Sequence, residues 1–258
     1  MNSKIKTAKG FKYDLKYDLD DPKRTLLHGE IIKSKPFLKK LYIEWYKNFL
    51  DEIKNIPSGK MIEIGSGGGF LKEIIPEVIT SDILPLENCD MTFSAENLPF
   101  AEDELSAIFM VNVLHHIPDP AKFFLEAEKK LKQGGMIVMV ETAYSVFSKI
   151  IYQNFHHEPF DTKAKWELTG GGPLSASNQA LPWIIFERDR KKFDQLFPHL
   201  KVISIKHHSP FRYLLSGGVS RKTLVPDWSF PIFASLEKLL TPFMKYLGMF
   251  ETIKIKKN

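Results

Sequence analysis

The spacing of apolar positions changes near residue 60 of this 258-residue chain. Residues 25–55 place apolar side chains three and four positions apart, as on one face of a helix, and Pro36 interrupts that spacing, which predicts two helices. From residue 60 to residue 141, short apolar runs alternate with amphipathic stretches. This alternation is typical of βαβ units, so we predict a parallel sheet with helices on both faces.

Five strands are expected in that middle region. They correspond to the stretches KMIEIG, EVITSDI, CDMTFSAE, ELSAIFMVNVL and MIVMVE. GFLKEIIP is expected as a short helix, and DPAKFFLEAEKKLKQGG as a longer helix with Pro120 near its start and glycines after its end. Further along, ERDRKKFDQLFP is expected as a helix, and KVISIKHH and FETIKIKK as strands.

Two connections are much longer than the few residues that usually join such elements. They cover about residues 142–183 and 209–249, and loops of that length are usually functional. If the strands that precede them are parallel, both connections leave from carboxyl ends of strands. Open α/β sheets bind their ligands at that edge.

Composition places the chain among ordinary globular proteins, with 43% hydrophobic and 26% charged residues. Cys89 is the single cysteine, which excludes an intramolecular disulfide and most thiolate metal sites. The start, MNSKIKTAKGFKYD, lacks the apolar segment of a signal peptide, and residues 1–24 are expected as a loose arm. No apolar run is long enough for a transmembrane helix, so we expect a cytoplasmic protein.

Positive charge gathers in the first 60 residues, where 14 Lys and Arg face 8 Asp and Glu. Such an excess can indicate an anionic partner, or simply a solvated, lysine-rich helix surface.

A glycine-rich loop follows the first predicted strand in MIEIGSGGGF, residues 61–70. Gly65 and Gly67 fit the first two positions of the dinucleotide pattern GxGxxG, but Phe70 occupies the place of the third glycine. The triphosphate pattern GxxxxGK[ST] does not occur. Glycine permits a ligand to approach the backbone closely, because a Cβ would collide with it.

Four stretches in order carry a family resemblance. The loop reads ExGxGxG from Glu63 to Gly69, and SAENLPF, NVLHHIPDP and LKQGGMIVMVE follow it. In order and spacing they resemble the type 11, UbiE-like branch of the class I S-adenosylmethionine-dependent methyltransferases. The resemblance implies a Rossmann-like α/β fold, with a seven-stranded sheet that is mostly parallel and has its last strand antiparallel.

The resemblance also implies a cofactor, S-adenosyl-L-methionine, and the residues that bind it. Asp82 is expected to accept the two ribose hydroxyls, and the segment after Ser94 to lie near the adenine. Ser94 departs from the family's usual Asp, and the usual helix between Asp82 and Glu96 is missing. The expected cofactor-binding residues are Glu63, Ile64, Gly65, Ser66, Gly67, Gly69, Asp82, Ile83, Ala95, Glu96, Asn97, Asn112 and Val113.

A single methyltransferase domain is expected to occupy residues 1–258. Its predicted parts are a helical N-terminal cap (1–58), a cofactor-binding core (59–141), substrate-side insertions (142–183 and 209–249), and the remaining helix and strands of the sheet (184–208 and 250–258).

Histidines near the ligand edge are the candidates for acid–base chemistry, because imidazole titrates near neutral pH. His116 and His157 are the candidate catalytic bases, with packing or capping as the alternative for the LHHI stretch. Substrate contacts are expected from His115, His156, Tyr144 and Arg212. The HHE run at 156–158 suggests a metal, but adjacent imidazoles rarely point at one ion and HExxH is absent, so no metal is expected.

The segment FPIFASLEKLLTPFMKYLGMF is strongly amphipathic, with Pro242 expected to begin a new helix after Thr241. It could form a lid, bind a lipid-like substrate or rest on a membrane surface as a peripheral contact. Its apolar positions at helical spacing are Ile232, Leu236, Leu239, Phe243 and Leu247.

The function indicated is methyl transfer to a small-molecule, lipid-linked or saccharide-linked acceptor. Nucleic-acid methylation is the main enzymatic alternative, but no NPPY-type loop or appended RNA-binding module occurs. A non-catalytic protein that binds S-adenosylmethionine remains open as well. A nicotinamide-dependent dehydrogenase is disfavoured because Phe70 breaks the dinucleotide pattern.

Overall fold

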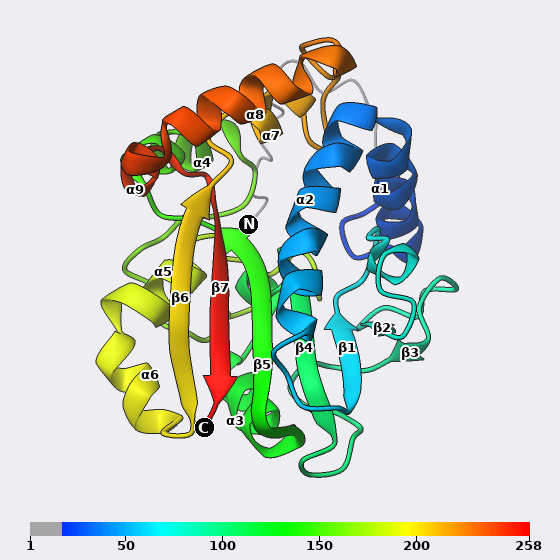
Figure 1. Cartoon of the computed structure of the whole chain (residues 1–258), viewed down its shortest axis with the longest axis vertical. Helices are drawn as coiled ribbons and strands as arrows, with labels where there is room; N and C mark the ends of the chain where they lie inside the picture. The colour runs from blue at the N-terminus through cyan, green and yellow to red at the C-terminus, as the bar shows by residue number, and fades with distance from the viewer. Residues whose placement is uncertain (1–16) are drawn as a thin grey trace.

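A seven-stranded mixed sheet forms the centre of the computed structural model, which describes residues 17–258 (Figure 1). The strand order is β3-β2-β1-β4-β5-β7-β6. Strands β1 to β5 pair in parallel, and β7 is antiparallel to both of its neighbours, which confirms the predicted fold class. The strands are β1 (Lys60–Ile64), β2 (Ile79–Asp82), β3 (Met91–Thr92), β4 (Leu105–Val111), β5 (Leu131–Thr142), β6 (Leu200–His208) and β7 (Phe250–Lys257).

The two helices expected before the sheet are α1 (Pro22–Ser34) and α2 (Pro36–Ile53). Asp21 caps α1 by accepting a hydrogen bond from the backbone N–H of Lys23. A proline begins each helix, where its missing N–H costs no helical bond. Of the loose arm expected over residues 1–24, the first sixteen residues lie outside the described part, and Pro22 already belongs to α1.

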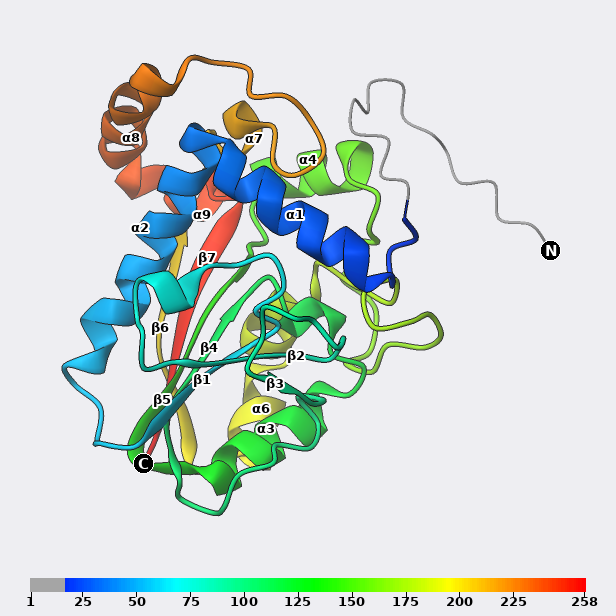
Figure 2. The ribbon, with the colours of Figure 1, turned by 90° about the vertical axis from the view of Figure 1, so that its right-hand side faces the viewer.

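Helix α2 covers one face of the sheet, while α3 (Pro120–Lys130) and α6 (Arg190–Leu196) lie on the other (Figure 2). The ring of Phe49 in α2 stacks on Phe109 of β4, with centroids 5.0 Å apart. The connections after β1 and after β2 are too short to cover the face of the sheet on which α2 packs. GFLKEIIP forms only the 3-10 turn η1 (Leu71–Glu73), since Pro76 disfavours helical geometry just before it, and no helix joins β2 to β3.

Helices from the two long connections lie above the carboxyl ends of the parallel strands (Figure 1). Strands β5 and β6 both pair antiparallel with β7, so they run in the same direction, and both long connections leave from the same edge, as predicted. These helices are α4 (Val146–Phe155), α7 (Arg212–Ser216), α8 (Phe230–Leu239) and α9 (Met244–Leu247).

Shorter helical turns complete the described chain. The stretch expected as one helix over residues 187–198 is divided, because the π-helical turn η3 precedes α6 and Asp189 separates the two. Pro242 lies in η5 and not at the start of a full helix. The turns are η2 (Leu114–His116), α5 (Leu181–Trp183), η3 (Ile184–Arg188), η4 (Asp227–Ser229) and η5 (Thr241–Phe243).

Candidate active site

A cavity of about 610 Å³ opens at the carboxyl edge of the sheet. The glycine loop and the ends of β2 and β4 line one side of it, and residues from both long connections line the other. Helix α1 contributes Arg24, Thr25 and His28 to the wall. The cavity therefore joins the predicted cofactor residues to the predicted substrate-side segments.

The glycine loop needs its glycines for turning and for packing against other elements. Gly65 and Gly67 have positive φ angles of 66° and 43°. A Cβ on Gly65 would lie 2.4 Å from Cγ2 of Val113, and a Cβ on Gly68 would lie 2.5 Å from the backbone nitrogen of Gly29. The loop is thus held between the end of β4 and helix α1.

Asp82 is the last residue of β2 and lines the cavity. Its Oδ2 accepts a hydrogen bond from the N–H of Gly67 (3.1 Å), and its Oδ1 accepts one from the N–H of Leu84 (2.9 Å). Burial raises the pKa of Asp82, although these backbone donors partly oppose that rise. A carboxylate has about four acceptor positions, so about two remain for hydroxyl donors in the cavity.

Two buried polar atoms in the cavity wall have no hydrogen-bond partner within the described chain. They are Oε2 of Glu63 and Oδ1 of Asn112, and both residues line the cavity. Burial, together with the charge of Asp82, raises the pKa of Glu63 to about 8. Asn112 also has a positive φ of 56°, a geometry that Asn tolerates better than most residues. Unpaired buried acceptors of this kind fit a ligand that carries hydrogen-bond donors.

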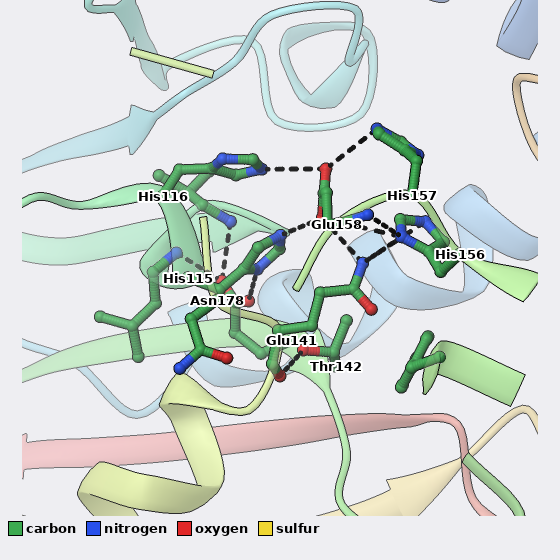
Figure 3. Close-up of polar contacts among 12 residues, drawn as sticks. His115, His116, Glu141, Thr142, His156, His157, Glu158 and Asn178 are labelled. Carbon is green, nitrogen blue, oxygen red and sulfur yellow. Dashed lines mark hydrogen bonds and ion pairs between the residues drawn. The ribbon is translucent and has the colours of Figure 1, made fainter. Parts of the chain in front are cut away.

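A cluster of histidines surrounds the carboxylate of Glu158 in the cavity wall (Figure 3). Oε2 of Glu158 lies 3.6 Å from Nε2 of His115 and 4.0 Å from Nδ1 of His156. Its Oε1 lies 3.7 Å from Nε2 of both His116 and His157. The tight turn η2 orients His115 and His116 toward the same carboxylate, with ring centroids 4.3 Å apart.

Glu141, at the end of β5, fixes the orientation of His115. Because a carboxylate oxygen only accepts, Nδ1 of His115 donates to Oε2 of Glu141 over 2.7 Å. Oε1 of Glu141 accepts from the backbone N–H groups of Val113 and Leu114. Burial alone lowers the pKa of His115, but Glu141 and Glu158 outweigh it and raise that pKa to about 10.

His116 differs from its neighbour in charge. Its Nδ1 donates to the backbone carbonyl of Ala176 over 3.1 Å, which leaves Nε2 as the acceptor nitrogen of the neutral ring. Burial, followed by the charge of His115, lowers the pKa of His116 to about 4. Gln179 donates from Nε2 to Oε2 of Glu158 over 2.8 Å.

Most of the candidates from the sequence line this cavity, and four do not. Glu96 instead accepts a hydrogen bond from the N–H of Asp119, which fixes the start of α3. Asn97 is also absent from the wall. The candidates that do line it are Glu63, Ile64, Gly65, Ser66, Gly67, Gly69, Asp82, Ile83, Ala95, Asn112, Val113, His115, His116, His156 and His157.

Tyr144 and Arg212 were expected to contact substrate, and the structure places both outside the cavity wall. The ring of Tyr144 packs on Trp183, with centroids 4.6 Å apart. The guanidinium of Arg212 binds Glu237 (2.6 Å) and Glu44 (2.7 Å), so it joins α7 to α8 and α2. Both side chains are occupied by structural contacts.

Sequence reasoning missed Thr142 and Gln179, which line the wall, and Glu141, which binds the wall residue His115. Glu141 and Thr142 end a predicted strand at the ligand edge, so their position was a usable signal. Gln179 lies inside the first long connection, where no periodic pattern marks it. Tyr213, in the second long connection, lines the cavity too.

Comparison with known proteins agrees with this geometry. A sequence profile described as "Methyltransferase domain" (Methyltransf_11) matches residues 62–139. That match runs from within β1 through most of β5, and it includes the glycine loop, Asp82 and Asn112. Within these residues the chain is similar to class I methyltransferase domains. S-adenosyl-L-methionine is the cofactor of such domains, and Asp82, Glu63 and Asn112 present oxygen atoms to the cavity that could bind it.

The curated relatives of this methyltransferase domain are distant. The ubiquinone biosynthesis O-methyltransferase of Hydrogenovibrio crunogenus is 22% identical over 108 residues, which cover 34% of this chain and 45% of that protein. An uncharacterized protein of Methanocaldococcus jannaschii is 29% identical over 103 residues, covering 36% of this chain and 50% of that protein. The chain thus spans about half the length of these relatives.

Among solved structures, the chain is similar to a possible histamine N-methyltransferase from Thermotoga maritima. The sequence identity is 17% and the TM-score is 0.48, over 90% of this chain and 100% of that one.

The affinity of the domain for S-adenosylmethionine is expected to rise by up to about tenfold per pH unit as the pH approaches 8. Below its pKa of about 8, Glu63 in the free protein is protonated, whereas a cationic ligand favours the carboxylate, so binding releases a proton. Calorimetric titrations at pH 6.5, 7.5 and 8.5 would measure this rise. The cofactor's own amino group titrates in every variant, so Glu63→Gln serves as the control. Parallel pH profiles for the two proteins would contradict the role of Glu63.

Proposed function

We propose that this protein transfers a methyl group from S-adenosylmethionine to a hydroxyl oxygen of a lipid-linked acceptor. The single observation that carries the proposal is one continuous cavity with two chemically different walls. One wall holds the glycine loop and Asp82, and the other holds the polar cluster around Glu158. The Hydrogenovibrio relative is named as an O-methyltransferase, which is the same class of acceptor atom.

Different side chains of the cavity would bind the cofactor and the acceptor. When bound, the cofactor supplies an electrophilic methyl group on a sulfonium. Asp82, Glu63 and Asn112 hold and orient it, because they offer carboxylate and amide oxygens from the ends of adjacent strands. His116 and Glu158 provide acceptors that would hold the hydroxyl of the acceptor. The covering helices exclude water and fix the approach, which lowers the barrier by orientation.

Methyl transfer is tested by measuring S-adenosylhomocysteine release with cell extract divided into lipid and aqueous fractions. Release that depends on the lipid fraction would support the proposal. Release with the aqueous fraction alone would replace it with a small-molecule acceptor. Calorimetric binding of S-adenosylmethionine without release from any fraction would favour the non-catalytic binding protein.

An exposed apolar surface beside the cavity favours a lipid-linked acceptor. The apolar stripe of the C-terminal segment faces outward and does not pack on the domain. Leu239 is 76% exposed and Phe243 is 56% exposed, while Leu247 is only partly exposed. On α4, Val146 and Ile150 are exposed as well. We name the set Val146, Ile150, Phe155, Leu224, Trp228, Ile232, Leu236, Leu239, Phe243 and Tyr246 the apolar rim.

The apolar rim is continuous with the mouth of the cavity and carries positive charge. Phe155 and Leu224 belong to both the rim and the cavity wall. Exposed lysines at positions 149, 238 and 245 lie on the same helices. Apolar side chains next to lysines suit the interface of an anionic membrane. No helix among residues 17–258 is long and apolar enough to cross a membrane, so the contact would be peripheral.

Replacing Leu239 and Phe243 together by serine is expected to weaken binding to anionic vesicles at least about tenfold. Each side chain buried at the interface contributes about 1.5–3 kcal/mol. Co-sedimentation with phosphatidylglycerol-containing vesicles measures the change, and zwitterionic vesicles or high salt should also reduce binding. Leu125→Ser, an exposed leucine of α3 outside the rim, is the matched control. Equal losses in both variants would argue against the membrane contact.

A further inference from the structure

We propose that His115, His116 and Glu158 form a binding site for a divalent transition-metal cation of the Zn²⁺ type. The two histidines come from the turn η2 after β4, and Glu158 comes from the first long connection. One ligand atom from each residue lies within 4.8 Å of the other two. No metal was expected from the sequence, because adjacent imidazoles rarely point at one ion. Here the turn η2 directs both rings toward Glu158 (Figure 3).

The distances to Glu158 fit shared ligation better than hydrogen bonding. A charge-assisted hydrogen bond between imidazole and carboxylate would join N and O over about 2.7–2.9 Å. The observed separations are 3.6 Å for His115 and 3.7 Å for His116. Two ligands on one tetrahedral ion with bonds near 2.0–2.1 Å lie about 3.4 Å apart. Each histidine nitrogen is therefore spaced from its nearer Glu158 oxygen nearly as two ligands of one ion.

The outer hydrogen bonds involve the Nδ1 atom of each ring and leave each Nε2 atom on the side of Glu158. Nδ1 of His115 is taken by Glu141, and Nδ1 of His116 is taken by the carbonyl of Ala176. For His116 this leaves the Nε2 lone pair facing a carboxylate oxygen, an arrangement of two acceptors that a cation between them would stabilise. Metal-ligating histidines characteristically donate their second N–H to a carboxylate or a backbone carbonyl in this way.

The donor set determines the class of ion. Two imidazole nitrogens and one carboxylate suit Zn²⁺ and related transition metals, whereas Mg²⁺ and Ca²⁺ prefer oxygen ligands. All three residues line the cavity, so positions not taken by protein would face it. A role in catalysis rests on the proposed methyl transfer. In that case His116 and Glu158 would hold the acceptor hydroxyl through the ion and not directly, and the ion would lower the pKa of that hydroxyl. The hydroxyl proton would then leave to solvent.

A second group of potential ligands provides an internal comparison. Glu187, His207 and Glu251 also place their ligand atoms within 4.8 Å of one another, but none of them lines the cavity. Nε2 of His207 lies 3.4 Å from Oε2 of Glu251. A protein that takes up one ion could hold it in either group, so the experiment must tell them apart.

The test uses the full-length protein, stripped with a chelator and then dialysed against Zn²⁺ alone, with metal counted by mass spectrometry. We expect one Zn²⁺ per chain with submicromolar affinity, and at least 100-fold weaker binding in His116→Ala and in Glu158→Gln. Glu141→Gln should weaken binding about 10–100-fold, since it changes only the partner of a ligand. Co²⁺ titration gives a second readout, the visible absorption of a cobalt–imidazole site. His199→Ala, an exposed histidine elsewhere, and His207→Ala should both bind like the wild type.

Loss of Zn²⁺ in His207→Ala with retention in His116→Ala would overturn the proposal, as would wild-type affinity in Glu158→Gln. So would failure of the wild-type protein to bind Zn²⁺. Circular dichroism of each variant confirms that it is folded. The measurement needs neither S-adenosylmethionine nor an acceptor. Zn²⁺ binding without methyl transfer would therefore refute only the proposed function, and methyl transfer without Zn²⁺ binding would refute only the metal site.

Discussion

An Asp82→Ala variant is expected to bind S-adenosylmethionine at least about 100-fold more weakly than the wild type. Asp82 lines the cavity from the end of β2, and two backbone N–H groups already orient its carboxylate. About two acceptor positions are left for ribose hydroxyls. Each hydrogen bond to a charged group contributes about 1.5–3 kcal/mol, so losing two costs at least about 3 kcal/mol. Isothermal titration calorimetry measures the change directly.

Asp90→Ala is the matched control for that experiment. Asp90 also lies at the edge of the sheet, where it accepts hydrogen bonds from the N–H and hydroxyl of Thr80, but it does not line the cavity. Its removal should leave the affinity for S-adenosylmethionine within about twofold of the wild type. If Asp82→Ala binds S-adenosylmethionine as tightly as Asp90→Ala does, the assignment of the cofactor site is wrong.

A Phe49→Ala variant is expected to lose about 3–5 kcal/mol of unfolding free energy. The side chain of Phe49 is fully buried between α2 and the sheet and stacks on Phe109. Removing a buried aromatic ring leaves a cavity as well as losing the hydrophobic transfer energy. That loss is a large fraction of the about 5–15 kcal/mol that stabilises a typical domain. We expect the melting temperature to fall by about 10 °C in a thermal scan followed by circular dichroism.

Leu50→Ala, at the next position of the same helix, is the control for Phe49→Ala. Leu50 is 40% exposed, so its truncation should change the unfolding free energy by less than about 1 kcal/mol. Similar unfolding free energies for the two variants would show that the packing of α2 on the sheet contributes little to stability. The difference we expect follows from the short connections after β1 and β2, which leave this face of the sheet for α2 to cover.

Local pattern predicted the elements well because each one depends on nearby residues. Alternating strands and helices, the break at Pro36 and the turn at Gly65 all follow from spacing and backbone freedom within about ten residues. The pairing of Glu63 with Asp82 in one site was predictable for a similar reason. Neighbouring parallel strands bring their carboxyl ends to one edge, so residues 19 positions apart meet there.

Long-range packing decided which polar side chains face the cavity. Tyr144 and Arg212 looked like substrate contacts, but Trp183 and Glu237 occupy them, and those partners come from other segments of the chain. The sequence also left open whether the apolar side chains of α8 and η5 are exposed. An amphipathic pattern does not determine whether the apolar face of a helix contacts protein or solvent.

The sequence by itself determined the order of the strands and helices, the glycine loop and the acid at the end of β2. Only the tertiary structure decided that His115, His116 and Glu158 converge. Glu158 lies more than forty residues after the two histidines, and its placement depends on how the first long connection folds back over the sheet. Glu141 then fixes the ring of His115 from yet another strand. Local spacing predicts elements because backbone preferences act over a few residues, whereas a polar cluster depends on packing among distant segments.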